Sequence, residues 1–318
     1  MAGRSLLFRN LNAKVAALPM IATVLVVFIG CTLWTVLYSF TSSRSLPMLN
    51  FVGFDQYTRL FGASRWEVSI KNLAIYGILS LIFSLVIGFL LAAFMDQKIR
   101  FENAFRTIFL YPFALSHIVT GLVWQWILNP LGIEKVVRDL GFESFSFALL
   151  SNRNLAIYAI VIAGLWQGTG LVMALMLAGL RNIDEEIWKA ARVDGIPTWK
   201  TYVFVVIPMM RPVFITTLVL IATGIVKLYD IVVAMTNGGP GISTEVPAKY
   251  VYDFMFGWAN LGQGLAASTV MLTTVLIILV PWAMLEFGGK KGERRQIARF
   301  LPRRKVVLEL GAKKAGRA

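Results

Sequence analysis

The chain has only one cysteine, Cys31, and one histidine, His117, among its 318 residues. A single cysteine cannot form a disulfide within the chain, so the fold does not depend on an oxidising compartment. With one residue of each kind, we expect neither a Cys-His pair for nucleophilic catalysis nor a metal site built from histidine and cysteine. We therefore expect no catalytic residue, no metal site and no cofactor held by this chain.

Charged residues are also scarce. They make up 15% of the chain, against about 25% in soluble domains, while hydrophobic residues make up 57%. The mean hydropathy is +0.70. This composition predicts a membrane protein. A net charge of +14 would indicate nucleic acid in a soluble protein. In a membrane protein anionic lipid headgroups account for it, and we expect no nucleic-acid partner.

Six apolar stretches are long enough to cross a bilayer, which takes about 20 residues each. The fold class is therefore predicted as all-α, a polytopic membrane protein with six transmembrane helices. The first stretch follows a basic start and lacks a small-residue cleavage site, so we expect it to remain as a signal anchor. The predicted spans are 15–39, 71–95, 107–128, 155–180, 212–235 and 262–286.

The distribution of lysine and arginine predicts the orientation. With the N-terminus in the cytoplasm, inside segments carry 22 of the 31 cations, outside segments carry 8, and Lys227 lies within the fifth span. The positive-inside rule then places both termini in the cytoplasm. The predicted organisation is a cytoplasmic N-terminus over 1–14, a permease domain over 15–287, and a basic cytoplasmic tail over 288–318 that contacts membrane lipid.

The loop at 181–211 is too polar to span and rich in helix formers. We predict two short cytoplasmic helices, the first capped by Asn182 and ended by a left-handed Gly195. Ile187, Ala190, Ala191 and Asp194 fall on one side of it at helical spacing. That face predicts docking into a partner's groove, although packing on the chain's own bundle explains the same pattern.

The order E-x-x-K-A-A-R-x-D-G from Glu186 to Gly195 resembles the EAA loop of bacterial binding-protein-dependent ABC importers. The runs Tyr111–Pro130 and Thr236–Pro240 (TNGGP) are similar to those of sugar permeases of the maltose-F and glycerol-phosphate type. The resemblance implies the type I importer permease fold, with the loop acting as the coupling helix against an ATPase subunit. The implied coupling residues are Glu185, Glu186, Lys189, Ala190, Ala191, Asp194 and Gly195.

The resemblance also implies the partners: a second permease, two ATPase subunits, an extracytoplasmic solute-binding protein and a sugar substrate, in the bacterial inner membrane. No G-x-x-x-x-G-K-[ST] phosphate loop exists in this chain, so ATP and magnesium are expected on the partner ATPase. One departure from the family pattern is Lys189, which stands where an acidic residue is usual. It predicts a neighbouring acid in the same role or a matched change in the ATPase.

The family places substrate between two permeases near the membrane midplane. Gln167 offers a neutral hydrogen-bonding group beside Trp166 in an apolar span, which suits a sugar, although packing against the second permease explains it equally. The glycines at 164 and 168 also match a helix-packing seam. By resemblance the substrate path comprises Gly164, Leu165, Gln167, Gly168, Leu171, Gly224, Lys227, Leu228 and Asp230.

Lys227 and Asp230 are predicted to lie one turn apart on the fifth helix. Charges at this depth face a cavity or a partner. They either neutralise one another as a local pair, or Lys227 is unpaired and suits an anionic sugar. His117 is predicted to be a packed, hydrogen-bonded residue, and the TNGGP run a tight external turn at Gly238 and Gly239.

The sequence therefore predicts a non-enzymatic permease subunit of an ATP-driven sugar importer. Two alternatives remain at this point: an ion-coupled secondary transporter that uses Lys227 and Asp230 without an ATPase, and an ABC permease for a solute other than a sugar.

Overall fold

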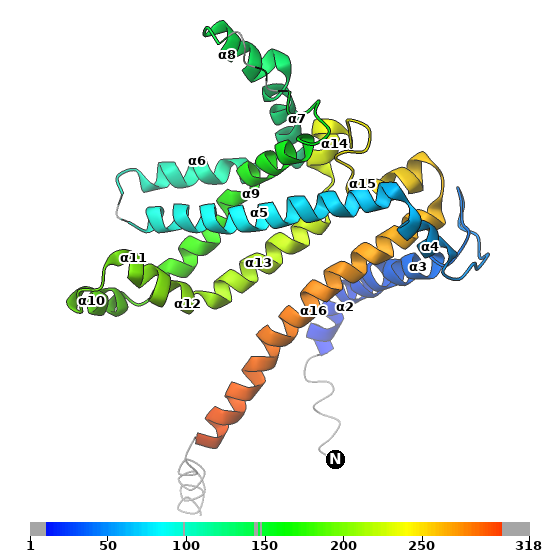
Figure 1. The fold of residues 1–318 in the computed structure, drawn as a ribbon. Helices are drawn as coiled ribbons and strands as arrows, with labels where there is room; N and C mark the ends of the chain where they lie inside the picture. Colours follow the sequence, from blue (N-terminus) through cyan, green and yellow to red (C-terminus); the bar gives the residue numbers. More distant parts are fainter. Residues whose placement is uncertain (1–10, 98, 143–145, 147, 301–318) are drawn as a thin grey trace, which may run out of the picture. The chain divides into compact units, whose positions relative to one another are not determined.

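The computed structural model describes residues 11–97, 99–142, 146 and 148–300 (Figure 1). Among these residues the ordered elements are helices without a strand, which confirms the all-α prediction. A single antiparallel bridge joins Thr41 and Phe51. Most of the predicted N-terminus and the tail beyond residue 300 lie outside the described residues. Contacts divide the chain into two units, Met1–Thr274 and Val275–Ala318, and the second continues helix α16.

Four of the described helical segments are long and apolar enough to cross a membrane: Ala16–Tyr38, Ser64–Asp96, Ala156–Arg181 and Leu261–Met284. Two bent pairs raise the number to six if each pair is one span. The helices are α2 Leu11–Thr23, α3 Cys31–Tyr38, α4 Asp55–Gly62, α5 Ser64–Asp96, α6 Glu102–Ala114, α7 His117–Ile127, α8 Lys135–Asp139, α9 Ala156–Arg181, α10 Glu185–Val193, α11 Thr198–Thr201, α12 Ile207–Met209, α13 Arg211–Val226, α14 Asp230–Thr236, α15 Pro247–Tyr252 and α16 Leu261–Phe300, with π-helical turns at Val24–Gly30, Pro130–Glu134, Tyr202–Val206 and Asp253–Gly257.

Helices α5 and α9 form the centre of the first unit and pack along most of their lengths. The buried stripe of α5 recurs every three or four residues and consists largely of small or polar side chains, while large apolar side chains such as Ile78, Leu90 and Phe94 face outward. Gly88 makes the close approach possible, because a Cβ there would lie 2.6 Å from Val172 Cγ1. Small residues at the interface are typical of helix packing in lipid.

The third predicted span, 107–128, is wrong as one helix. It forms α6 and α7, which meet at an angle of 99° across a break at Leu115 and Ser116. Ser116 has extended backbone angles (φ −61°, ψ 141°), so the helical ladder cannot continue through it. Helix α6 packs on α9, whereas α7 packs on α14.

The fifth predicted span, 212–235, is also interrupted. Helix α13 ends at Val226, and α14 begins only at Asp230. Tyr229 separates them with φ −145° and ψ −62°, which lies outside the helical region. At its other end α13 is bent by 71° from the helical segment Thr198–Met209.

A buried ion network holds the segment after α14 against the start of α5. Arg65 bonds Glu245 at 3.0 Å and also pairs with Asp253, which accepts a 2.7 Å bond from Lys249. Burial raises the pKa of the Glu245 carboxyl, and the neighbouring Arg65 and Lys249 oppose that shift. Asn72 of α5 donates to the Glu245 carbonyl at 2.8 Å. These bonds fix the end of the bundle that carries the TNGGP run.

Candidate solute cavity and coupling helix

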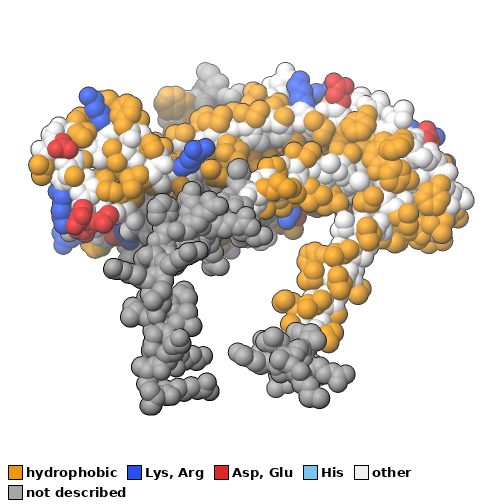
Figure 2. All heavy atoms as spheres, turned by 90° about the horizontal axis from the view of Figure 1, so that it is seen from below, with side chains coloured by type: hydrophobic (Ala, Val, Ile, Leu, Met, Phe, Trp, Pro, Cys, Tyr) orange, Lys and Arg blue, Asp and Glu red, His pale blue; other side chains and the backbone are white. Residues whose placement is uncertain are grey.

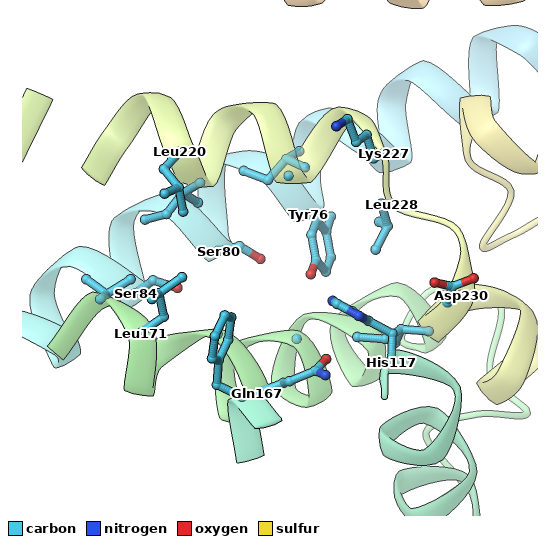
Figure 3. Close-up of a pocket in the computed structure, with 18 of the residues that line it drawn as sticks. Tyr76, Ser80, Ser84, His117, Gln167, Leu171, Leu220, Lys227, Leu228 and Asp230 are labelled. Carbon is cyan, nitrogen blue, oxygen red and sulfur yellow. The ribbon is translucent and has the colours of Figure 1, made fainter. Parts of the chain in front are cut away.

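A cavity of about 370 Å³ lies where α5, α9 and α13 meet the two helix breaks (Figure 3). Its wall combines hydroxyl, amide and charged side chains with glycine and apolar surface. The lining residues used below are Tyr76, Ser80, Ser84, His117, Gly164, Gln167, Gly168, Leu171, Gly224, Lys227, Leu228 and Asp230. The structure thus brings together every residue of the predicted substrate path except Leu165, which packs against the apolar core.

Lys227 and Asp230 are not neighbours on one helix, contrary to the prediction. Lys227 caps the C-terminus of α13, Asp230 opens α14, and the break between them removes the helical i, i+3 geometry. The two side chains form no ion pair in the described structure, and their charged ends point apart in Figure 3. Both are exposed and line the cavity, so a cation and a carboxylate are both accessible there.

Gln167 is 3% exposed and is held by its own chain. Its Nε2 donates to the carbonyl of Leu115 at 2.8 Å, across to the α6–α7 break. Its Oε1 has no hydrogen-bond partner among the described residues. The neighbouring Trp166 points elsewhere and contacts Trp124 edge-on at 6.1 Å between ring centroids.

The two glycines predicted as a packing seam behave differently. A Cβ on Gly164 would collide with the Tyr76 hydroxyl, so this glycine does allow α9 to approach α5. A Cβ on Gly168 would meet nothing within 4 Å. Gly168 therefore widens the cavity, and the second seam position is Gly170, whose Cβ would collide with the Phe109 carbonyl of α6.

Several lining residues were missed from the sequence. His117 was predicted to be packed and hydrogen-bonded, but it is exposed on the cavity wall at the first turn of α7 and bonds none of the described residues. Tyr76, Ser80 and Ser84 follow one another at four-residue spacing on the buried stripe of α5. That spacing of hydroxyl-bearing residues inside an apolar span was the signal that could have identified them.

The first of the two helices predicted in the loop 181–211 forms as α10, with a different start. Asn182 ends α9 instead of capping α10. The cap is Asp184, whose side-chain oxygen accepts from the Glu186 N–H at 3.0 Å, and Glu185 lies in the first turn, where acids complement the helix dipole. Gly195 has φ +66°, so its left-handed role at the C-terminal end is confirmed.

The outward face of α10 also differs from the predicted one. Ala191 is only 8% exposed and lines a cavity between α10 and the ends of α5 and α9, so it faces its own chain. Ala190 is exposed, and Val193 is 87% exposed. Lys189 pairs with Glu185 at 3.6 Å on the exposed surface. In Figure 2 acidic and basic side chains group at the end that carries α10, while apolar side chains are spread over the rest of the described surface in view.

Comparison with known proteins gives the family. A family model described as "Binding-protein-dependent transport system inner membrane component" matches residues 84–285. A probable ABC transporter permease protein of Pyrococcus horikoshii is 34% identical over 261 residues, which cover 81% of this chain and 89% of that protein. The trehalose/maltose transport system permease protein of Thermococcus litoralis is 27% identical over 284 residues, covering 85% and 91%.

Among solved structures, a bacterial ABC transporter involved in the import of the acidic polysaccharide alginate shares the fold with a TM-score of 0.74. The match covers 90% of this chain and 96% of that one at 19% identity. Several helices of the chain are long and apolar enough to cross a membrane. Together with the family model and the 34% identical permease, they show that this chain belongs to the family of binding-protein-dependent transport system inner membrane components.

Proposed function

We propose that this chain is one of two transmembrane subunits that form the pathway of an ATP-driven importer for a sugar or sugar derivative. The cavity carries the proposal, because it joins the neutral polar groups of Tyr76, Ser80 and Gln167 to an apolar wall. Hydroxyls and amides beside apolar surface suit a polyhydroxylated solute. The names of the trehalose/maltose relative and the alginate importer support the same solute class.

In this proposal the chain crosses the membrane six times, and both termini lie in the cytoplasm with the loop 181–211 and the tail 288–318. An extracytoplasmic solute-binding protein delivers the solute. Two partner ATPases hold ATP and magnesium. When they close, they move α10 and swing the permease pair between inward-open and outward-open states, as a rigid-body change driven by a partner's ligand.

The exposed face of α10 is the proposed contact with the ATPase. Ala190 and Val193 present small apolar side chains there, and Glu186 adds an acid. Because Val193 is 87% exposed, it touches little in its own chain. A charge at Val193 should therefore weaken the interface without disturbing the permease fold.

The test is purification of the complex with Val193→Asp. We expect loss of the ATPase subunits, or of ATP hydrolysis stimulated by the loaded binding protein, whereas Val193→Thr, which keeps the side-chain shape, behaves like the unmodified complex. Unchanged assembly and hydrolysis in Val193→Asp would contradict the coupling role of α10. Solute uptake by vesicles that contain no ATPase would contradict the ATP-driven importer itself.

The unpaired Lys227 favours an anionic group on the solute. A charge-assisted hydrogen bond contributes about 1.5–3 kcal/mol, or roughly a 10- to 150-fold change in affinity. Lys227→Met should therefore reduce uptake of uronic or phosphorylated sugars by about that factor and leave a neutral disaccharide nearly unaffected. Equal effects on acidic and neutral sugars would show that Lys227 does not select for charge.

A further inference from the structure

The break between α6 and α7 is connected to the cavity by a single side chain. Helix α6 ends at Ala114, and α7 starts at His117. The carbonyl of Leu115 lies at the bend, where the chain turns by 99° and offers no helical partner. Its acceptor is satisfied from another helix, by the Nε2 of Gln167 on α9 at 2.8 Å. This bond ties the bend to α9.

The chemistry of the amide fixes which end of Gln167 faces which way. Only the NH₂ group can bond a carbonyl oxygen, because Oε1 has no proton to donate. Oε1 is therefore the end left over, and it has no partner among the described residues although the side chain is 97% buried. Figure 3 shows this oxygen turned toward the cavity interior.

A buried acceptor without a donor is unfavourable. Oε1 has almost no accessible surface in this conformation, so a group that enters the cavity bonds it only after a small shift of the amide. A solute hydroxyl is such a group. The same amide that accepts from the solute donates to the bend, and hydrogen bonds in a chain strengthen one another by polarisation. A donor that bonds Oε1 would therefore also act on the bond to the carbonyl of Leu115.

The bend does not move alone. Helix α7 packs on α14, where a Cβ on Gly121 would lie 2.5 Å from Ala234 Cβ and 3.3 Å from the Ile231 carbonyl. Because backbones this close transmit displacement, a change in the angle at Leu115 carries α14 with it. Helix α14 begins at Asp230 on the opposite wall of the cavity.

We propose that Gln167 is a positioning residue that couples occupation of the cavity to the angle of the α6–α7 bend. It holds the bend through Nε2 and senses a solute donor through Oε1. The proposal rests on the proposed function only in taking this cavity as the solute path; the role of Nε2 in holding the bend stands without it.

The experiment measures the bend by spin-label distances. Cys31→Ser removes the native cysteine, and Phe105→Cys on α6 with Trp126→Cys on α7 places labels on two exposed positions. The full complex is reconstituted in lipid nanodiscs with Gln167, Gln167→Met or Gln167→Asn. Methionine keeps the volume and removes the amide, whereas asparagine keeps an amide one methylene too short to reach Leu115.

Without ATP we expect one narrow distance distribution for Gln167, and a second population that rises about three- to tenfold in both variants, the effect of losing one buried hydrogen bond. Thr169→Val is the matched control, because its hydroxyl bonds Leu165 within α9 at 2.6 Å and does not touch the bend. It should reproduce the narrow distribution. Identical distributions in Gln167 and Gln167→Met, or equal broadening in Thr169→Val, would overturn the proposal.

A second arm separates the proposal from the proposed function. Trapping the native Gln167 complex with ATP, vanadate and loaded binding protein should populate the second distance that Gln167→Met shows without nucleotide. If trapping leaves the distances unchanged while Gln167→Met still broadens them, the bend is held by Gln167 but is not used in ATP-driven transport. If trapping shifts the distances and the variant does not, Gln167 is not the coupling residue.

Discussion

The two charged regions of this protein differ in how their charges are satisfied. Around Glu245 two cations and two acids are paired within one buried network. In the cavity Lys227 and Asp230 are exposed and unpaired with one another. Both regions place charged side chains in an otherwise apolar protein. Only in the first region are the charges paired with one another and therefore not free to bind another molecule.

This difference in pairing indicates that the network around Glu245 stabilises the fold, whereas the cavity charges are available for a solute. Burying a charge is unfavourable unless a partner compensates it, so the network around Glu245 makes sense as a tie between α5 and the segment after α14. The cavity charges instead lie at helix breaks, where the local i, i+3 pairing of a continuous helix is lost. Charges left in this way can be satisfied by something that enters from outside.

The largest effect is expected from breaking the paired network. Arg65→Met leaves Glu245, whose side chain is 1% exposed, without its main partner. Removing one partner of a buried pair costs about 3–5 kcal/mol. The free energy of unfolding in mixed detergent should fall by that amount. Arg59→Met is the control, since Arg59 makes only an exposed pair with Asp55 at 2.8 Å and should change stability by less than about 1 kcal/mol.

The same network predicts a pH dependence. Because burial raises the pKa of Glu245 above its ordinary value, its contribution to stability is complete below that ordinary pKa. The contribution is lost as the pH rises through the raised pKa. Glu245→Gln removes this titration, so its stability relative to the native protein should improve as the pH increases across this window. Parallel stability profiles for the two proteins would contradict a raised pKa.

Removing the cavity charges of Lys227 and Asp230 should, by contrast, have little effect on stability. Lys227→Met and Asp230→Asn remove exposed charges that hold no internal pair, so each should change the free energy of unfolding by no more than about 0.5 kcal/mol. Thermal unfolding of the purified complex gives the measurement. A loss as large as that of Arg65→Met would mean that these charges are structural, and the contrast between the two regions would fail.

The smallest effect is expected at α10. Lys189 and Glu185 pair at 3.6 Å with side chains 63% and 87% exposed. An exposed pair of this kind contributes at most about 0.5 kcal/mol. Lys189→Ala should therefore leave the unfolding midpoint of the isolated subunit unchanged. Any defect in ATP hydrolysis by the assembled complex then reports on the proposed ATPase contact and not on the stability of the helix.

A continuous transmembrane helix such as α9 could be predicted from the sequence because each apolar residue adds to the mean hydropathy of the window. The ends of 155–180 agree with α9 to within a residue, since nothing in that stretch interrupts the apolar run. The breaks at Leu115 and Tyr229 escaped prediction because hydropathy averages over about 19 residues and does not register where backbone hydrogen bonding stops. Family resemblance supplied the residues of the predicted substrate path, and the structure places all of them but Leu165 around one cavity.

The errors at α10 have a similar origin. Ile187, Ala190, Ala191 and Asp194 share a side by helical spacing, but spacing alone does not say which part of that side faces the bundle. Ala191 faces inward because the ends of α5 and α9 lie on its side of the helix. Likewise, Asn182 and Asp184 are both good caps by composition. The end of α9 at Arg181 places Asn182 in the wrong position for the second helix.

The small-residue stripe of α5 has a consequence for how this protein tolerates change. Its outward positions, such as Ile78 and Leu90 at 60% and 61% exposed, can exchange for other apolar residues of different size without a clash. Its inward positions cannot, because Ser69 and Ala92 are fully buried and Gly88 has no room for a methyl group. In a library of random substitutions in α5, functional variants should thus carry most of their changes on the hydrophobic outward face. Few changes should survive at the inward serine and glycine positions.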